Sequence, residues 1–301
     1  MCAAVEPASV LEEAPPGLAP GRRLLLKRED RHELSAFKWR GALPALEAYR
    51  EQGASAVVTA STGNHGAATA WAAQRTGLRA VVFMPEDVSR AKVALMESLG
   101  AELRAAGADV DEAKDAARTF AAEGGLPFFE DGAEEAQFRG YEAIGREIVE
   151  QLGERPALTL VPVGNGALLI GVARHLTNAV GVVSKDAPVM ALSVAAGQPV
   201  HCNRMSTFAD GLAVRVAVPL AVQELVKLGT PFVQVSERAI ARGVGAFAAS
   251  GLRVEGSAAA ALAALDEVDV PDGPVVLVVT GSNIDDELYR RAVERPESFP
   301  D

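Results

Sequence analysis

The apolar positions of the chain form short continuous runs that alternate with longer amphipathic stretches. Short runs of apolar and β-branched residues predict buried strands, here at 23–26, 54–59, 79–84, 158–163, 189–194, 232–235 and 275–279. Helical periodicity between them predicts helices from Ser35 to about 52, from the turn at 60–66 to Gly77, and at 89–99, 109–122, 134–152, 167–177, 218–228, 237–249 and 257–265. Such alternation is typical of parallel sheets covered by helices on both faces, so the sequence predicts an α/β fold.

The region before the first predicted helix carries two local signals. Residues 1–21 are rich in proline and glycine, which predicts a loop that crosses the surface. Ser35 stands just ahead of the helix, and its hydroxyl is suited to accept hydrogen bonds from backbone N–H groups near Lys38. We therefore expect Ser35 to cap this helix.

Composition and charge narrow the class of protein. The 301 residues are enough for one large domain or two ordinary ones, and no apolar run approaches the roughly 18 residues that span a bilayer. The first residues lack the basic start and apolar centre of a signal peptide. A formal net charge of −11 argues against nucleic acid and anionic membrane as partners. Cys2 and Cys202 form neither a disulfide framework nor a zinc spacing, so we expect a reduced, cytoplasmic protein.

Lys38 is the first candidate for chemistry, because it stands between Phe37 and Trp39 at the expected start of a helix. Desolvation between aromatic rings disfavours the ammonium form, and a neutral amine can form a Schiff base. The alternative is a surface lysine whose stem covers apolar neighbours on an amphipathic helix.

Two turns join a predicted strand to a predicted helix and are candidate anion sites. Backbone N–H groups at Gly164–Leu168, together with the helix dipole, can hold an anion, although an ordinary strand–helix turn gives the same pattern. A dinucleotide fingerprint is excluded because Leu169 stands where the third glycine is needed. The turn at Ser61–His65 has the same placement and can also receive an anion.

Several motifs occur together in a family-like order. They are S-x-F-K-x-R-G-A at 35–42, A-S-T-G-N-H-G at 60–66, V-P-V-G-N-G-A-L at 161–168 and V-V-T-G-S-N at 278–283, with K-R-E-D at 27–30, M-P-E-D at 84–87, A-D-G at 209–211 and V-S-E-R-A-I at 235–240. In this order the chain resembles pyridoxal-phosphate enzymes of the tryptophan synthase β type (fold type II), within the threonine/serine dehydratase and serine racemase branch. The resemblance runs from about Leu24 to Phe299.

The resemblance implies an architecture of two domains. A large cofactor-binding domain is expected at 1–52 and 133–301, with a small inserted domain at 53–132 that carries the substrate-carboxylate loop. Pyridoxal 5′-phosphate is expected in the cleft between them. The partners implied are a small amino-acid substrate and a second copy of the chain in a homodimer.

The resemblance also implies roles for individual residues. Lys38 is expected to hold the cofactor as a Schiff base and to take the substrate α-proton, while Thr280 faces the pyridine nitrogen. Phe37 and Gly211 correspond to the residues on the two ring faces. The expected phosphate loop consists of Gly164, Asn165, Gly166, Ala167 and Leu168, although the family usually has glycine in place of Asn165 and Ala167. The expected substrate-carboxylate loop consists of Ser61, Thr62, Gly63, Asn64 and His65, with Asn64 also bonding the cofactor's 3′-oxygen.

Other positions leave alternatives open. Thr62 stands where the racemase has a catalytic serine, and it does not decide between reactions. His65 is interpreted as a structural hydrogen-bonding residue rather than a base. Glu255 either lines the pocket or is a carboxylate favoured by a helix start. The racemase branch has a cation site after the strand that we place at 189–194, and because S-V-A-A-G-Q-P-V-H offers no acid there, we predict no metal site.

The reaction that these features favour is β-elimination from a small hydroxy-amino acid such as threonine or serine, which yields a 2-oxo acid and ammonia. The alternatives are β- or γ-replacement, as in cysteine or threonine synthases, and racemisation. A homologue that binds the cofactor without turnover is a further alternative, although Lys38, Asn64, Gly164, Gly166 and Thr280 are all in place.

Overall fold

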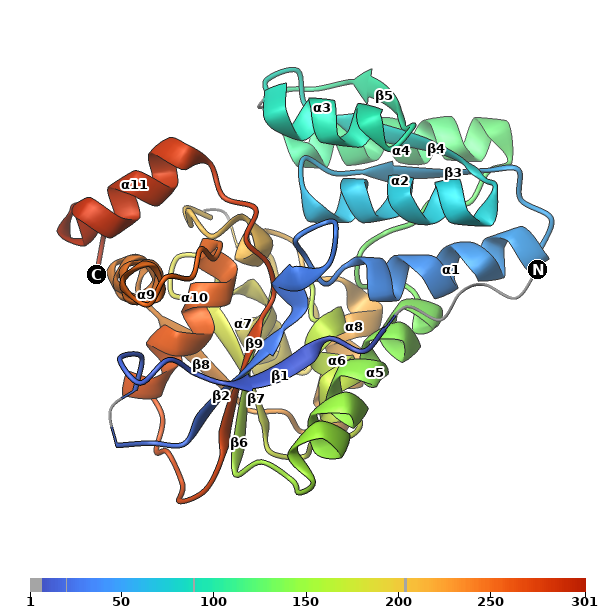
Figure 1. Cartoon of the computed structure of the whole chain (residues 1–301). Helices are drawn as coiled ribbons and strands as arrows, with labels where there is room; N and C mark the ends of the chain where they lie inside the picture. The colour runs from blue at the N-terminus through green and yellow to red at the C-terminus, as the bar shows by residue number, and fades with distance from the viewer. Residues whose placement is uncertain (1–6, 20, 89, 203–204) are drawn as a thin grey trace.

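A computed structural model describes residues 7–19, 21–88, 90–202 and 205–301, and it contains two separate sheets (Figure 1). The larger sheet has the order β1 (Val10–Glu13), β2 (Leu24–Arg28), β9 (Val275–Val279), β6 (Leu158–Pro162), β7 (Ala179–Ser184) and β8 (Phe232–Val235). Only β1 is antiparallel to its neighbour among these strands. The smaller sheet is parallel and consists of β3 (Ala56–Ala60), β4 (Arg79–Met84) and β5 (Glu102–Ala105).

Helices cover both faces of the larger sheet, as its continuous apolar strands require. Along β9, Val275, Leu277 and Val279 face one core, whereas Val276 and Val278 face the other. The first core is closed by α9 (Glu237–Ala249), α10 (Gly256–Ala263) and α11 (Asp286–Glu294). The second is closed by α5 (Glu135–Leu152), α6 (Ala167–Ala173), α7 (Val189–Ala196) and α8 (Pro219–Leu228).

The smaller sheet has its own cores and is joined to the larger one through α1 (Trp39–Glu51). Helix α1 packs on α2 (Asn64–Thr76) on one side and on α5 on the other, so it lies between the two sheets (Figure 1). Two further helices, α3 (Arg90–Ser98) and α4 (Val110–Gly124), cover the smaller sheet, and their apolar residues pack on its strands. Short 3-10 helices occur at Glu29–Arg31, Asp210–Leu212, Ala264–Asp266 and Pro296–Ser298.

The expected α/β class is confirmed, but one strand of the larger sheet was placed wrongly. The run at 189–194 is not a strand, because Val189–Ala196 forms α7. The strand in this part of the sheet is β7, which begins at residue 179, ten residues before the predicted start at 189. A short apolar run does not distinguish strand from buried helix, and Gly181 weakens the strand signal of β7. Glycine is needed at this position because an added Cβ would lie 2.8 Å from the Phe232 ring and 2.7 Å from Leu169.

Three further differences lie near the ends of the chain and ahead of α1. Ser35 does not cap α1; it has a φ of 51°, and the N-cap position is occupied by Lys38. Part of the predicted N-terminal loop is the edge strand β1. The sequence interpretation also omitted α11, which Asp285 caps by accepting hydrogen bonds from the N–H groups of Glu287 and Leu288.

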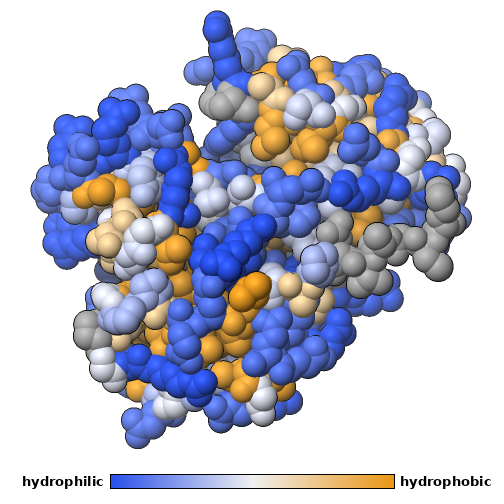
Figure 2. Space-filling view, in the orientation of Figure 1, coloured by the Kyte–Doolittle hydropathy of each residue, from blue (hydrophilic) through white to orange (hydrophobic). Residues whose placement is uncertain are grey.

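The surface is largely hydrophilic, with apolar residues in separate patches (Figure 2). It is hollowed between the part of the molecule that carries α11 and the part that carries the smaller sheet (Figure 2). Within the described residues, no helix has the length and apolar character needed to cross a membrane.

Candidate active site

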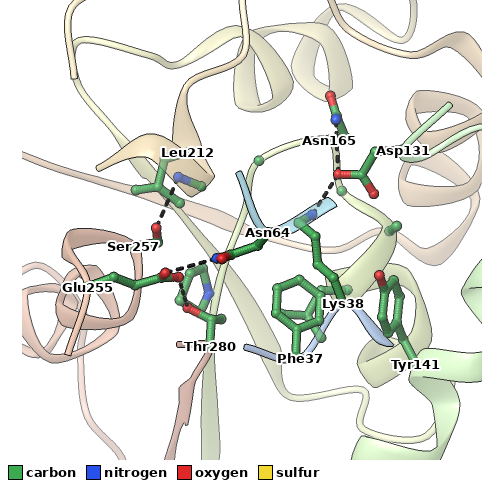
Figure 3. Close-up of a pocket in the computed structure, with 16 residues that line it drawn as sticks. Phe37, Lys38, Asn64, Asp131, Tyr141, Asn165, Leu212, Glu255, Ser257 and Thr280 are labelled. Carbon is green, nitrogen blue, oxygen red and sulfur yellow. Dashed lines mark hydrogen bonds and ion pairs between the residues drawn. The ribbon is translucent and has the colours of Figure 1, made fainter. Parts of the chain in front are cut away.

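A pocket lies at the carboxyl ends of β6 and β9, the edge at which parallel α/β sheets bind ligands. Lys38 lies near its centre, with the rings of Phe37 and Tyr141 beside it (Figure 3). The lining residues come from the end of β6, from several helices and from the loops between them: Phe37, Lys38, Asn64, Asp131, Tyr141, Pro162, Gly164, Asn165, Gly166, Ala167, Leu168, Gly211, Leu212, Glu255, Ser257 and Thr280. All ten residues predicted to bind the cofactor therefore lie around one pocket.

Lys38 enters the pocket from the N-terminal end of α1. The N–H of Phe37 donates to the carbonyl of Thr280 over 3.1 Å, which fixes this end of α1 beside the end of β9. The Lys38 Nζ lies 5.0 Å from the centre of the Phe37 ring. Trp39 does not flank the amine as the sequence suggested, because its ring stacks on His32 with centroids 4.6 Å apart. Only one of the two neighbouring aromatics therefore shields the amine.

Buried charges fix the first turn of α1 and so the position of Lys38. Arg40 donates to Glu29 over 2.8 Å and to both carboxylate oxygens of Glu147 over 2.8 and 2.9 Å. Lys27, which is fully buried, also pairs with Glu147 over 2.6 Å. Charges removed from water need partners of this kind. Two residues of the K-R-E-D motif therefore hold the first turn of α1 against β2 and α5.

The loop between β6 and α6 makes a close backbone approach to the segment that contains Gly211. A Cβ at Gly164 would lie 2.2 Å from the Gly211 carbonyl oxygen, and one at Gly211 would lie 2.5 Å from the Ser257 hydroxyl. Gly166 has a φ of 93°, which favours glycine. Three glycines are thus needed for the shape of this cradle. Asn165 and Ala167, the two departures from the family pattern, occupy positions where side chains are accommodated.

Glu255 connects Asn64 and Thr280, which are both predicted to contact the cofactor. Its carboxyl group accepts from Asn64 Nδ2 over 3.0 Å and from the Thr280 hydroxyl over 3.1 Å (Figure 3). Burial raises the pKa of Glu255, and this outweighs the hydrogen bonds from Asn64 and Thr280, which favour the carboxylate. Asn64 also accepts from Asn283 over 2.8 Å, so its orientation is fixed on both sides. Glu255 lines the pocket, which was one of its two sequence interpretations.

The remaining residues of the predicted substrate-carboxylate loop are not among those that line the pocket. Ser61 accepts from the N–H of Gly63 over 3.1 Å and so orders the loop, while Thr62 is half-buried. The His65 ring is buried, with Nε2 3.0 Å from the Thr59 hydroxyl and 3.3 Å from the Phe129 carbonyl. Burial lowers the pKa of His65. These contacts agree with a structural role for His65.

Asp131 is a pocket residue that sequence reasoning missed. It follows the isolated bridge at Phe128 and lies 93 positions from Lys38, yet its Oδ2 accepts from Lys38 Nζ over 2.6 Å. Burial alone would raise the pKa of Asp131, but the charge of Lys38, with hydrogen bonds from Lys38 and Gln137, lowers it below its usual value. No motif surrounds this aspartate, so only the folded chain brings it to the lysine.

The predicted absence of a cation site loses its sequence basis. It relied on the residues after a strand at 189–194, and that segment is α7. Within the described residues, no group of three or more His, Cys, Asp or Glu side chains is placed to hold a metal ion. Metal independence therefore stays a prediction.

The two sheets, the cradle and the lysine on α1 define the fold type II architecture of pyridoxal-phosphate enzymes. The family model described as pyridoxal-phosphate dependent enzyme matches residues 9–281. The chain belongs to this family, among relatives of the threonine dehydratase type.

Curated relatives include L-threonine ammonia-lyase of Geobacter sulfurreducens, 34% identical over 285 residues that cover 91% of this chain and 71% of the relative. Another is the biosynthetic L-threonine dehydratase of Pasteurella multocida, 35% identical over 202 residues. That match covers 65% of this chain and only 39% of the relative.

Solved structures of threonine deaminases have the same fold as this chain. Threonine deaminase isoform 2 from Solanum lycopersicum, in its processed form, is 28% identical with a TM-score of 0.87 and coverages of 96% and 88%. The threonine deaminase of T.th. is 29% identical with a TM-score of 0.83, and each chain is covered over 92%.

The residues present fit pyridoxal phosphate. Gly164, Gly166 and Gly211 have no side chains, so the backbone of the cradle packs closely and faces the pocket, as a backbone seat for a phosphate requires. An amine, a buried hydroxyl on Thr280 and the ring of Phe37 face the same pocket. These are the groups that a phosphorylated aromatic aldehyde needs for covalent attachment, hydrogen bonding and stacking.

Proposed function

We propose that this protein is a pyridoxal-phosphate dependent ammonia-lyase that converts a small hydroxy-amino acid, L-threonine or L-serine, to a 2-oxo acid and ammonia. The observation that carries the proposal is the position of the Lys38 amine, which shares one pocket with the glycine cradle and with the Asn64–Glu255–Thr280 network. Bound pyridoxal phosphate supplies the electron sink that stabilises a carbanion at the substrate α-carbon.

Each group of residues has a distinct task in the proposal. Backbone N–H groups of the 164–168 loop would hold the phosphate, and Phe37 and Gly211 would lie against the ring. Thr280 would face the pyridine nitrogen, and Asn64 would bond the ring oxygen. Because Glu255 holds both Asn64 and Thr280, it orients two cofactor contacts at once. The 61–65 loop receives the substrate carboxylate.

Lys38 has two tasks, which occur one after the other. It anchors the cofactor and, once substrate has displaced it, its Nζ takes the α-proton as a general base. Loss of the β-hydroxyl and hydrolysis then give the 2-oxo acid and ammonia. The names of the relatives, L-threonine ammonia-lyase among them, support threonine as the first substrate to test.

The test is a panel of amino acids incubated with the purified protein, with 2-oxo acid and ammonia as the readouts. L-Threonine and L-serine should release both products without any second substrate, and Lys38→Ala should abolish release. Product formation only when a second nucleophile is added would favour a replacement reaction instead.

Three further expectations belong to this proposal. The small domain is taken as 53–132, which contains the smaller sheet with α2, α3 and α4. The protein is taken as a homodimer, which size-exclusion chromatography with light scattering would test. A cytoplasmic location is also proposed, supported by the half-buried Cys202, which is in no disulfide. Cys2 lies outside the described residues.

A further inference from the structure

Asp131 makes contacts that the proposed function does not yet use. Its Oδ2 accepts from Lys38 Nζ over 2.6 Å and from Asn165 Nδ2 over 3.3 Å (Figure 3). One carboxylate oxygen is therefore shared by the lysine and by a side chain of the expected phosphate loop. Asn165 stands where the family usually has glycine, which has no side chain to make such a contact.

The carboxylate is held rigidly from the opposite side. Gln137 on α5 donates from Nε2 to Asp131 Oδ1 over 2.6 Å and accepts at Oε1 from the N–H of Gly132 over 2.8 Å. Gln137 is fully buried, and the side chain of Asp131 is 14% exposed. Because both ends of one amide hold this turn, the direction of the carboxylate is fixed before Lys38 approaches it.

We propose that Asp131 is a positioning residue, which holds the Lys38 amine toward the 164–168 loop and stabilises its ammonium form. This inference rests on the proposed function. When Lys38 takes the α-proton its amine becomes an ammonium ion, and Asp131 stays ionised as the counter-ion. A charge-assisted hydrogen bond in a shielded pocket favours that ammonium more than solvent would. The proton moves from carbon to Lys38 Nζ, and Asp131 neither gains nor loses one.

Other titratable groups face this ion pair, but they do not replace it. His65 on α2 has Nδ1 3.9 Å from Asp131 Oδ1, and burial lowers the pKa of this histidine, which keeps the ring neutral in the physiological range. Tyr141 on α5 stays protonated because burial raises its pKa. Glu255, ahead of α10, is a second acid facing Lys38, and burial raises its pKa, which favours the neutral form. Asp131 is therefore the acid in contact with the amine.

The test measures how fast Lys38 captures pyridoxal phosphate at different pH values. Full-length protein freed of cofactor is mixed with pyridoxal phosphate, and capture is followed by absorbance and mapped to Lys38 after borohydride reduction. A neutral amine attacks the aldehyde, so removing the counter-ion should move the midpoint of the pH profile downward. For Asp131→Asn we expect a shift of about 1 to 3 pH units, the scale of a neighbouring opposite charge. Asp131→Glu, which keeps the charge, should restore most of the midpoint.

The matched control is Glu130→Gln, which removes the charge of the preceding residue. Glu130 pairs with Lys114 over 2.9 Å and with Arg118 outside the pocket, so its loss should leave the midpoint in place. Asn165→Gly provides a second variant if Asp131→Asn does not fold. It removes the other side-chain donor to Oδ2, so the oxygen holds the ammonium more strongly and the midpoint should rise. An unchanged midpoint in the folded variants would overturn the assignment.

Measuring turnover tests the role of Asp131 separately from the proposed ammonia-lyase reaction. In Asp131→Asn, kcat for ammonia release should fall more than KM rises, because the ammonium arises only after proton transfer. A shifted capture midpoint without ammonia release from any amino acid would overturn the proposed function and support the role of Asp131. Ammonia release together with an unshifted midpoint would overturn the role of Asp131 alone.

Discussion

Adding a single methyl group in Gly164→Ala should weaken pyridoxal phosphate binding sharply. The new Cβ would lie 2.2 Å from the carbonyl oxygen of Gly211 and 3.7 Å from a methyl group of Val214. Ordinary contact between a carbon and such an oxygen needs roughly 1 Å more, and the neighbouring atom belongs to the backbone and cannot rotate away. Because both glycines line the pocket, the 164–168 loop must move away from the ring face at Gly211.

The size of the effect follows from the cost of overpacking. Inserting a methyl group into a packed site costs about 1 to 3 kcal/mol. If that cost falls on the cofactor-bound state, the dissociation constant rises about 5- to 150-fold, since 1.4 kcal/mol is a factor of ten. Fluorescence titration of cofactor-free protein with pyridoxal phosphate measures this directly, and thermal unfolding without cofactor reports any general loss of stability.

Gly245→Ala in α9 is the control for the added methyl group itself. The nearest atoms to a Cβ there belong to Val293 at 3.9 Å, so the methyl group fits and alanine favours the helix by up to about 1 kcal/mol. If Gly164→Ala bound pyridoxal phosphate as tightly as the parent and Gly245→Ala do, the cradle would not be the cofactor site.

Three further predictions concern charge and metals. The pKa of Glu255 is raised in the folded protein, so the parent loses stability as pH rises above 4.5 and Glu255 ionises. Glu255→Gln cannot ionise, so its Tm should rise relative to that of the parent over this range. Tm curves of parent and variant that stay parallel with pH would contradict this. Lys27→Met removes one partner of a buried pair with Glu147 and should cost about 3 kcal/mol in urea unfolding. Arg79→Met is the exposed control: the Arg79 side chain, paired with Glu102, is 60% exposed, so its loss should cost less than about 1 kcal/mol. Chelation should leave turnover and Tm unchanged, because no three His, Cys, Asp or Glu side chains among the described residues are placed to hold a metal ion, and a loss restored by magnesium would refute this.

Local pattern was sufficient for most elements of the larger sheet. The strands at 232–235 and 275–279 and the helix at 237–249 have the bounds that the sequence predicted. Pattern was insufficient where the tertiary structure overrides it, as at β7, whose central Gly181 is required by the Phe232 ring on the adjacent strand. Helix α11 had a usable signal, since Asp285 caps an amphipathic stretch, and it could have been found.

In the site, too, some residues could be predicted from local sequence and others only from the folded structure. Motifs predicted eleven of the sixteen residues that line the pocket, because the glycines and the lysine stand in short recognisable segments. Asp131 lies far from Lys38 in sequence and has no motif, so its contact exists only after α5 and the 164–168 loop are in place. The packing of Trp39 on His32 is likewise a property of the folded core.

The central assignment is Lys38 as the residue that binds pyridoxal phosphate covalently. Borohydride reduction of the purified yellow protein, followed by proteolysis and mass spectrometry, identifies the labelled lysine. We predict that the phosphopyridoxyl group is on the peptide that contains Lys38, and that Lys38→Ala carries none. Label on Lys27 or Lys92 in place of Lys38 would contradict the assignment of the active site.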